Sequence, residues 1–382
     1  MSLLDPQDWT FPCPIAYGPG RIAEIGEIAR RAGMSNPLVV TDRGSRDLPF
    51  IRQIRETLGT SGLHAEIAPN PRDDEVSAGC EVYRAGGHDG IVAVGGGSGL
   101  DGAKAIALTV NNDLPIGRFD YLQPQPEVAT PFPPLITVPT TAGTGAESET
   151  TAMVTDTQAM TKYCAWHSNA KVSHVILDPE LTVGLPRNLT AWTGMDALTH
   201  AIEAYLVPGF HPLCDGPALE GLRLIRRYLV RAVEVPDDLE ARGGMLVGSC
   251  LAGVAFLKGL GLVHAISHMV GAEFDTHHGL TNAVLLPPVL KFNEGAIADK
   301  VMPMTDAMGL QDRSFDGLYA DICALCDRLE IPRGLAELGV TGDRVDALAS
   351  KAMTDGAAGT NPREATLAEM AELIAASLDT AR

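Results

Sequence analysis

The chain has little positive charge and no cluster of it. Its 382 residues include 29 lysines and arginines against 48 aspartates and glutamates, a formal net charge of −19. A protein with this balance lacks the general electrostatic footprint that attracts nucleic acids and anionic membranes. We therefore expect no nucleic-acid and no membrane partner, although a local cationic pocket stays compatible with the composition.

Cysteine is scarce and shows no framework spacing. Seven cysteines are an odd number, which excludes a complete disulfide framework and fits a reducing cytoplasm. Cys323 and Cys326 form one CxxC pair without a second pair, inside a segment with helical apolar spacing. We expect this pair to belong to a hydrophobic core rather than to a zinc or redox site.

Targeting and membrane-spanning patterns are also lacking. The first residues, MSLLDPQDWTFPCP, contain no basic segment followed by an apolar one, so we expect no signal peptide. The most apolar stretch, residues 245–265, is interrupted by Lys258 and by glycines. A buried helix explains this stretch better than a membrane span, and the expected location is the cytoplasm.

Short apolar runs alternate with helical patterns in the first half of the chain. Four such runs end in turn residues, at 37–42, 90–99, 133–145 and 173–179. Runs that are apolar at every position are typical of parallel strands covered on both faces, and helical segments between strands favour a doubly wound sheet.

Beyond residue 186 the strand patterns stop and helical spacing prevails. A chain of this length suits two domains. We expect an α/β, doubly wound, nucleotide-binding N-terminal domain over residues 1–186 and an all-α, metal-binding C-terminal domain over residues 187–382.

A glycine-rich turn, Gly95, Gly96, Gly97 and Ser98, lies between an expected strand and an expected helix. Glycines let backbone N–H groups approach a phosphate, and a helix N-terminus adds partial positive charge. The turn matches neither the GxGxxG fingerprint nor a P-loop. A tight turn with Asp101 as an acid in the first helical turn is the simpler alternative.

Polar residues follow two other expected strands. Thr140, Thr141 and Thr144 come after the run at 133–145, at the edge where open α/β sheets bind ligands. Asp42 ends the run at 37–42, where a carboxylate accepts hydrogen bonds from an adenosine ribose and repels a 2′-phosphate. The alternatives are a structural polar loop and an aspartate that caps a turn.

Four of the ten histidines fall between residues 259 and 279: His264, His268, His277 and His278. His264 and His268 are four apart and share a helical face, and the spacer that follows is long enough to bring His277 or His278 back to them. Such a cluster in apolar surroundings predicts a metal site.

A metal site of imidazoles usually includes a carboxylate, and Asp196 and His200 provide one more i, i+4 pair among apolar neighbours. The combined set of nitrogen and oxygen donors suits Zn²⁺ or Fe²⁺ with one position open for a substrate oxygen. The spacing alone does not decide between the two metals.

Taken together and in order, these motifs resemble the iron-containing, or group III, alcohol dehydrogenases of the dehydroquinate-synthase-like superfamily. The resemblance runs through nearly the whole chain. The matching stretches are AYGPGRIAEIG, VTD, PNP, VGGGSGLDGAKAIAL, PTTAGTGAESE, GMDALTHAIEAY, GLGLVHAISHMVGAEFDTHHGLTNAVLLP and GTNPRE.

The resemblance implies roles for individual residues. The implied metal ligands are Asp196, His200, His264 and His278, for Fe²⁺ or Zn²⁺. His268 would lie beside the nicotinamide and relay a proton, while His277, where relatives often carry proline, receives no role. The implied residues of the NAD site are Asp42, Asn70, Gly95, Gly96, Gly97, Ser98, Asp101, Thr140, Thr141, Thr144, Lys162 and Leu181, with the acid at position 42 selecting NAD over NADP.

The implied activity is hydride transfer between NAD and a small primary alcohol or diol, giving the aldehyde. One alternative is a relative acting on a hydroxy or oxo acid, in the manner of a maleylacetate reductase or a transhydrogenase. Another is a lyase or cyclase acting on a sugar phosphate, which would need a cationic cluster, whereas Lys258 is the nearest cation to the metal motifs in sequence. Members of the family are commonly dimers or larger, so we expect a homo-oligomer.

Overall fold

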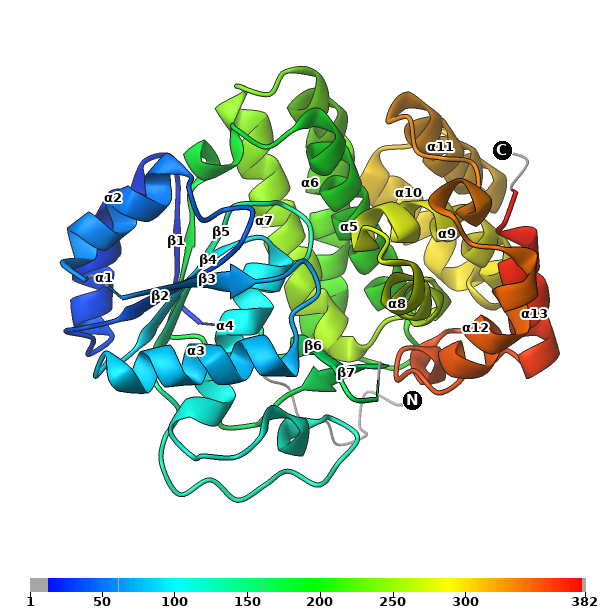
Figure 1. Cartoon of the computed structure of the whole chain (residues 1–382). Coiled ribbons are helices and arrows are strands. Elements are labelled where there is room, and N and C mark those ends of the chain that lie inside the picture. The colour runs from blue at the N-terminus through cyan, green and yellow to red at the C-terminus, as the bar shows by residue number, and fades with distance from the viewer. Residues whose placement is uncertain (1–12, 61, 160, 380–382) are drawn as a thin grey trace.

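The N-terminal half of the chain forms one sheet of six parallel strands, in the order β1-β8-β5-β4-β2-β3 (Figure 1). The computed structural model describes residues 13–60, 62–159 and 161–379. The strands are β1 (Ile15–Tyr17), β2 (Leu38–Asp42), β3 (Leu63–Ile67), β4 (Ile91–Gly95), β5 (Leu135–Pro139) and β8 (His174–Leu177). An antiparallel hairpin, β6 (Ala152–Asp156) and β7 (Thr161–Ala165), stands beside the sheet.

Alternate residues of each central strand enter two different hydrophobic cores. In β4, Ile91 and Ala93 pack in the core on the α3–α4 face, whereas Val92 and Val94 pack in the core on the α1–α2 face. This is why the strand is apolar at every position. The covering helices are α1 (Ile25–Arg31), α2 (Pro49–Leu58), α3 (Asp73–Ala85) and α4 (Gly97–Val110).

The doubly wound α/β prediction is confirmed, and each of the four apolar runs contains a strand. The edge strands β1 and β3 and the hairpin were not expected from the sequence. β1 has only three residues, and β3 and β7 mix polar with apolar residues. None of these three strands therefore shows a long apolar run in the sequence.

All helices beyond residue 186 share one core. They are α5 (Arg187–Leu206), α6 (Pro212–Glu234), α7 (Leu239–Ala255), α8 (Leu262–Phe274), α9 (His278–Asn293), α10 (Ala298–Met308), α11 (Phe315–Arg328), α12 (Val345–Ala352) and α13 (Leu367–Ala376). α5 lies at the centre and packs against α6, α7 and α9. It is apolar on nearly all sides and buried along most of its length, as expected for a helix enclosed by others.

The apolar stretch 245–265 is divided among the end of α7, the short 3₁₀ turn 256–258 and the start of α8. The segment Leu239–Lys258 is long and apolar enough to cross a membrane, but 67% of its apolar window is buried inside the protein. Cys323 and Cys326 lie on α11, and Cys326 is buried in the helical core as expected. None of the seven cysteines, all of them within the described residues, forms a disulfide.

The loop after β5 reaches across to the helical half, where its backbone touches α7. Gly145 has φ +64°, and its backbone packs directly on Gly253. A Cβ at Gly253 would overlap the carbonyl oxygen of Gly145. Only a residue without a side chain allows this approach of two backbones.

We predict that Gly253→Ala lowers the free energy of unfolding by about 1–3 kcal/mol, because the added methyl group overlaps backbone that has no room to move. Gly216→Ala on α6 is the matched control, since nothing lies within 4 Å of a Cβ there. Urea unfolding of both variants tests this, and equal midpoints would contradict it.

Candidate active site

The carboxyl ends of β2 and β4 meet where the winding of the sheet reverses, the position at which open α/β sheets bind ligands. Asp42 ends β2, and its carboxylate accepts hydrogen bonds from the N–H and the hydroxyl of Ser45, both at 2.9 Å. The same carboxylate lies against Gly95, where a Cβ would come within 2.5 Å of Oδ2. Asp42 therefore caps its turn, as the simpler alternative holds, and also borders the glycine-rich turn.

The two polar loops of the sheet edge lie side by side. Thr140 N–H donates to the Gly95 carbonyl at 2.9 Å. A Cβ at Gly96 would lie 3.5 Å from the methyl group of Thr141, and one at Gly97 would overlap Thr144. Gly97 is the first residue of α4, so backbone N–H groups of this helix end face the same edge as the threonines. This juxtaposition suits an extended anionic ligand.

A buried ion cluster fixes the start of α4 to the second loop. Lys104 is 2% exposed and lies 3.1 Å from Asp101 and 2.5 Å from Glu149. Burial acts to lower the pKa of Lys104, but the two carboxylates more than offset this effect. The pKa of Lys104 therefore lies above its ordinary value, and the ammonium stays charged. Asp101 also accepts a hydrogen bond from Met153 N–H. Its described contacts are internal, and a role toward a pyrophosphate remains a prediction.

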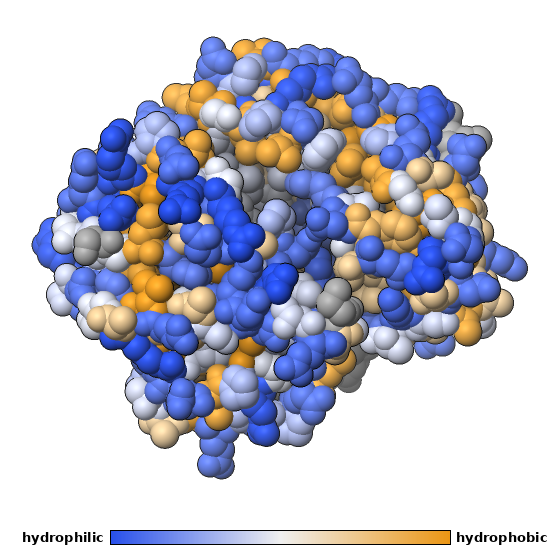
Figure 2. Space-filling model, in the orientation of Figure 1, coloured by the Kyte–Doolittle hydropathy of each residue, from blue (hydrophilic) through white to orange (hydrophobic). Residues whose placement is uncertain are grey.

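A chain of three polar residues joins the sheet edge to the helical half. Lys162 on β7 donates to Asn70 Oδ1 at 2.6 Å, and Asn70 Nδ2 donates to Asp275 Oδ1 at 2.9 Å. Asp275 follows α8 directly, so this chain spans from the sheet half to the histidine-rich segment. Burial lowers the pKa of Lys162 to about 8. Figure 2 shows a hollow near the middle of this face, between the two halves.

Leu181 lies in the 3₁₀ turn Pro179–Thr182 after β8, and it packs against the core on the α1–α2 face. The contacts described for it are with this core, so they do not join it to the glycine-rich turn. Its expected contact with a nucleotide stays a prediction.

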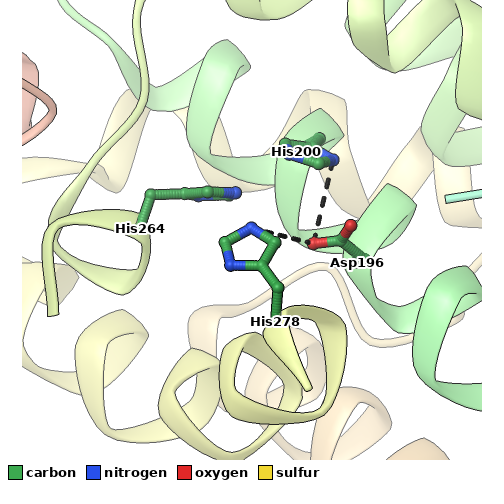
Figure 3. Close-up of side chains that lie close together, drawn as sticks. All are labelled: Asp196, His200, His264 and His278. Carbon is green, nitrogen blue, oxygen red and sulfur yellow. Dashed lines mark ion pairs between the residues drawn. The ribbon is translucent and has the colours of Figure 1, made fainter. Parts of the chain in front are cut away.

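Four possible metal ligands from three helices converge on one point (Figure 3). Asp196 and His200 come from α5, His264 from α8 and His278 from the first position of α9. One donor atom of each lies within 4.8 Å of those of the other three. Asp196 Oδ1 is 3.7 Å from His278 Nε2 and 4.0 Å from His200 Nδ1.

Each of the three imidazoles forms a hydrogen bond through Nδ1, on the side away from its Nε2. His264 Nδ1 donates to Glu203 at 2.6 Å, and His200 Nδ1 donates to the Gly143 carbonyl at 3.3 Å. His278 Nδ1 is 3.0 Å from Ser267 Oγ. Partners of this kind fix the tautomer. In His264 and His278 they leave the Nε2 lone pairs, which lie inside the group, available to a cation.

Burial, followed by the neighbouring histidines, lowers the pKa of His264 and of His278 well below the ordinary value. Neutral imidazoles are the form that binds metals. The donor set therefore fits a divalent cation.

Two residues that the sequence reading missed hold this group together. Glu203, on α5, accepts hydrogen bonds from the N–H groups of Gly261 and Val263 at 3.0 and 2.8 Å, so it also caps α8. Asn282, on α9, places its Nδ2 2.7 Å from Asp196 Oδ1. Glu203 follows His200 by three residues and Asn282 follows His278 by four, so each shares a helical face with a donor. This spacing was the sequence feature that could have pointed to them.

His268 and His277 lie beside the group but outside it. His268 Nδ1 is 2.9 Å from Asp355 Oδ2, and its ring stacks on His278 with centroids 5.5 Å apart. The His277 ring accepts a hydrogen bond from Leu280 N–H at the start of α9 and packs on Trp192. His277 therefore acts as the N-cap of the helix that carries His278.

Lys258 is the nearest cation to the metal motifs in sequence, but a different lysine influences the site in the folded protein. Lys258 is buried and held by Asp215 at 2.7 Å. Lys162, distant in sequence, lies close enough to contribute to the lowered pKa of His278. The fold thus brings a lysine from the sheet half near the histidines.

Comparison with known proteins decides the family. Residues 12–179 match the family model of the iron-containing alcohol dehydrogenases, and residues 190–378 match the model of their C-terminal part. The chain belongs to the iron-containing alcohol dehydrogenase family. It is therefore an oxidoreductase that interconverts alcohol and aldehyde, as the resemblance implied.

Two curated relatives and one solved structure illustrate this membership. The NAD-dependent methanol dehydrogenase of Bacillus methanolicus is 35% identical over 95% of this chain and 98% of that protein. The 1,3-propanediol dehydrogenase of Citrobacter freundii is 36% identical over 96% and 97%. A crystal structure of a 1,3-propanediol oxidoreductase superposes with a TM-score of 0.92 at 34% identity, over 97% of this chain and 99% of that one.

Within this alcohol dehydrogenase, Glu147 anchors the loop that carries the threonines. The side chain is 2% exposed, and burial raises its pKa from 4.5 to about 7. The Cys250 thiol on α7 and the neighbouring backbone donate to it and only partly offset this effect.

We predict that Glu147 makes the enzyme less stable as the pH rises from about 4.5 to 7. In this range the folded state binds a proton that the unfolded state has lost, so stability falls by up to about 3 kcal/mol. Glu147→Gln should reduce that fall in urea unfolding at pH 5 and pH 8. An unchanged pH dependence would contradict the prediction.

Proposed function

We propose that the chain is a metal-dependent, NAD-linked dehydrogenase of small primary alcohols or diols. The observation that carries the proposal is the convergence of Asp196, His200, His264 and His278 on one point. The Lys162–Asn70–Asp275 chain joins the end of α8, the helix that carries His264, to the sheet half. The names of the relatives, a methanol and a 1,3-propanediol dehydrogenase, support the substrate class.

We propose Fe²⁺ as the metal, with Zn²⁺ as the alternative, since both accept imidazole and carboxylate ligands. When bound, the divalent cation supplies Lewis acidity that stabilises an alkoxide. Asp196 supplies the negative charge of the donor set, and the hydrogen bonds at Nδ1 orient the imidazoles.

His268 is the proposed proton relay. Asp355 accepts from its Nδ1, which orients the ring and leaves Nε2 for proton exchange. Both side chains are partly exposed, at 14%, so a proton has a route to solvent.

NAD is the proposed hydride acceptor. The N-terminus of α4, the glycine-rich turn and the threonines would hold the pyrophosphate, with Asp101, Lys162, Asn70 and Leu181 in the positions that the family pattern gives them. Asp42 would bind the ribose. The cations nearest to it in sequence, Arg43 and Arg46, pair with Glu66 and Glu75, which leaves them less available to a 2′-phosphate.

Three broader features belong to the same proposal. The nucleotide-binding domain would cover residues 1–186 and the metal-binding domain residues 187–382. The proposed location of the protein is the cytoplasm. A homo-oligomer is supported by β1, an edge strand of the described sheet on which Ile15 and Tyr17 are exposed.

Activity on a hydroxy or oxo acid is the second candidate function. A lyase or cyclase acting on a sugar phosphate is less favoured, because Asp215 neutralises Lys258 and Lys162 already donates to Asn70. Reduction of NAD with a panel of alcohols, diols and hydroxy acids, followed by absorbance, separates these activities. No NAD reduction with any of them would contradict the proposal.

We predict that His264→Ala loses bound metal and at least about 100-fold of its activity, because one of four donors is removed. Its affinity for NADH, measured by fluorescence, should stay within a few-fold of wild type. His268→Ala is the matched control on the same helix and should keep its metal. Full metal occupancy in His264→Ala would overturn the ligand assignment.

We predict that Asp42→Asn raises kcat/KM for NADP by about tenfold, because it removes the charge that repels a 2′-phosphate. The amide keeps the size of the side chain. Its oxygen accepts from Ser45 N–H as before, and its Nδ2 donates to the Ser45 hydroxyl in place of the bond that the carboxylate accepts. Asp47→Asn, an exposed change in the same loop, should leave the ratio of NADP to NAD unchanged. The same ratio in both variants would refute selection by Asp42.

A further inference from the structure

We propose that Asn282 is a positioning residue that holds the metal-binding group in its converged arrangement. The inference rests on the proposed metal site and adds a residue that is not among its ligands. Asn282 is completely buried on α9, one helical turn after His278. Its side chain is in contact with donors from all three helices of the site.

The contacts all involve one atom. Asn282 Nδ2 lies 2.7 Å from Asp196 Oδ1 and 3.1 Å from each of His264 Nε2 and His278 Nε2. An amide nitrogen only donates, so the two imidazole nitrogens must be unprotonated. Their protons then lie on Nδ1, where Glu203 and Ser267 are placed to accept them. The amide thus selects the tautomers that a metal requires.

The donor count shows which contact persists when a cation binds. The amide has two N–H groups for three acceptors. A cation would use the Nε2 lone pairs, so the contacts to the imidazoles are given up on binding. A carboxylate oxygen has a second lone pair, so the short bond to Asp196 can continue beside a cation. Asn282 therefore orients Asp196 in both states.

The other end of the amide has no compensating partner. Asn282 Oδ1 is buried and accepts no hydrogen bond among the described residues. A buried carbonyl without a donor destabilises a fold, and an apolar residue of similar size would avoid this cost. The structure thus keeps an amide where packing alone favours leucine. The contacts of Nδ2 are the only benefit seen for it in the described part of the chain.

The test measures metal affinity rather than turnover. In chelator competition with Zn²⁺, Asn282→Leu should bind about 10–100-fold more weakly than wild type, the usual effect of removing a partner of a metal ligand. Thr281→Val is the matched control, because Thr281 is equally buried on α9 but bonds Thr276 and the His277 carbonyl. It should bind Zn²⁺ as wild type does.

A spectrum separates positioning from loss of structure. The visible absorption of the Co²⁺-loaded protein reports ligand geometry, and we expect it to change in Asn282→Leu but not in Thr281→Val. NADH binding should be unaffected in both. If Asn282→Leu does not fold, Asn282→Ala provides the same comparison without added bulk.

The outcomes distinguish the inference from the proposed function. Wild-type affinity and spectrum in a folded Asn282 variant would overturn the role of Asn282 and leave the metal site intact. A wild-type protein that binds no divalent cation would overturn both. Equal loss in the Thr281 variant would show that α9 is merely sensitive to change, and would also overturn the specific role.

Discussion

The buried carboxylate of Glu203 is the interaction on which the site depends. It joins α5 to the first turn of α8, and its Oε2 also accepts a hydrogen bond from His264 Nδ1. Burial raises its pKa to about 7, and the N–H groups of Val263, Gly261 and His264 oppose that rise. The same carboxylate thus fixes the rotation of α8 about its axis and the tautomer of His264. A rotation of α8 would break the hydrogen bonds that fix both. The donors of α5 and α8 therefore stay aligned.

The second constraint is the joining of two different cores. The sheet half supplies a ligand-binding edge and the helical half supplies the donors, so a reaction between their ligands requires a fixed relation between them. Gly145 against Gly253 provides contact between backbones, and the Lys162–Asn70–Asp275 chain provides polar contact across the cleft. Both contacts involve loop residues, Gly145 in one and Asn70 with Asp275 in the other.

The sequence predicted much of this arrangement. The apolar runs indicated the central strands, because residues buried on both faces leave a clear pattern. The i, i+4 spacing of Asp196 and His200 indicated the donor pair of α5, because α-helical geometry is local, whereas of His264 and His268 only His264 joins the group. The edge strands escaped detection, since β1 is short and β3 is polar on one side. The spacing of Asn282 and Glu203 places them on the same helical faces as His278 and His200, but it does not separate a positioning residue from an ordinary polar one. The spatial role of Lys162 also needed the fold, because sequence proximity had pointed to Lys258.

By itself, then, the sequence determined the class of fold, the family and the chemical type of each donor, because these depend on residue identity and on periodicities of a few residues. The tertiary structure brought donors from three helices to one point, placed His268 and His277 beside that group and brought Lys162 near His278. It also decided that Asp42 borders the glycine turn while capping its own loop. These facts are set by long-range packing between helices and strands, for which a single sequence contains no local pattern.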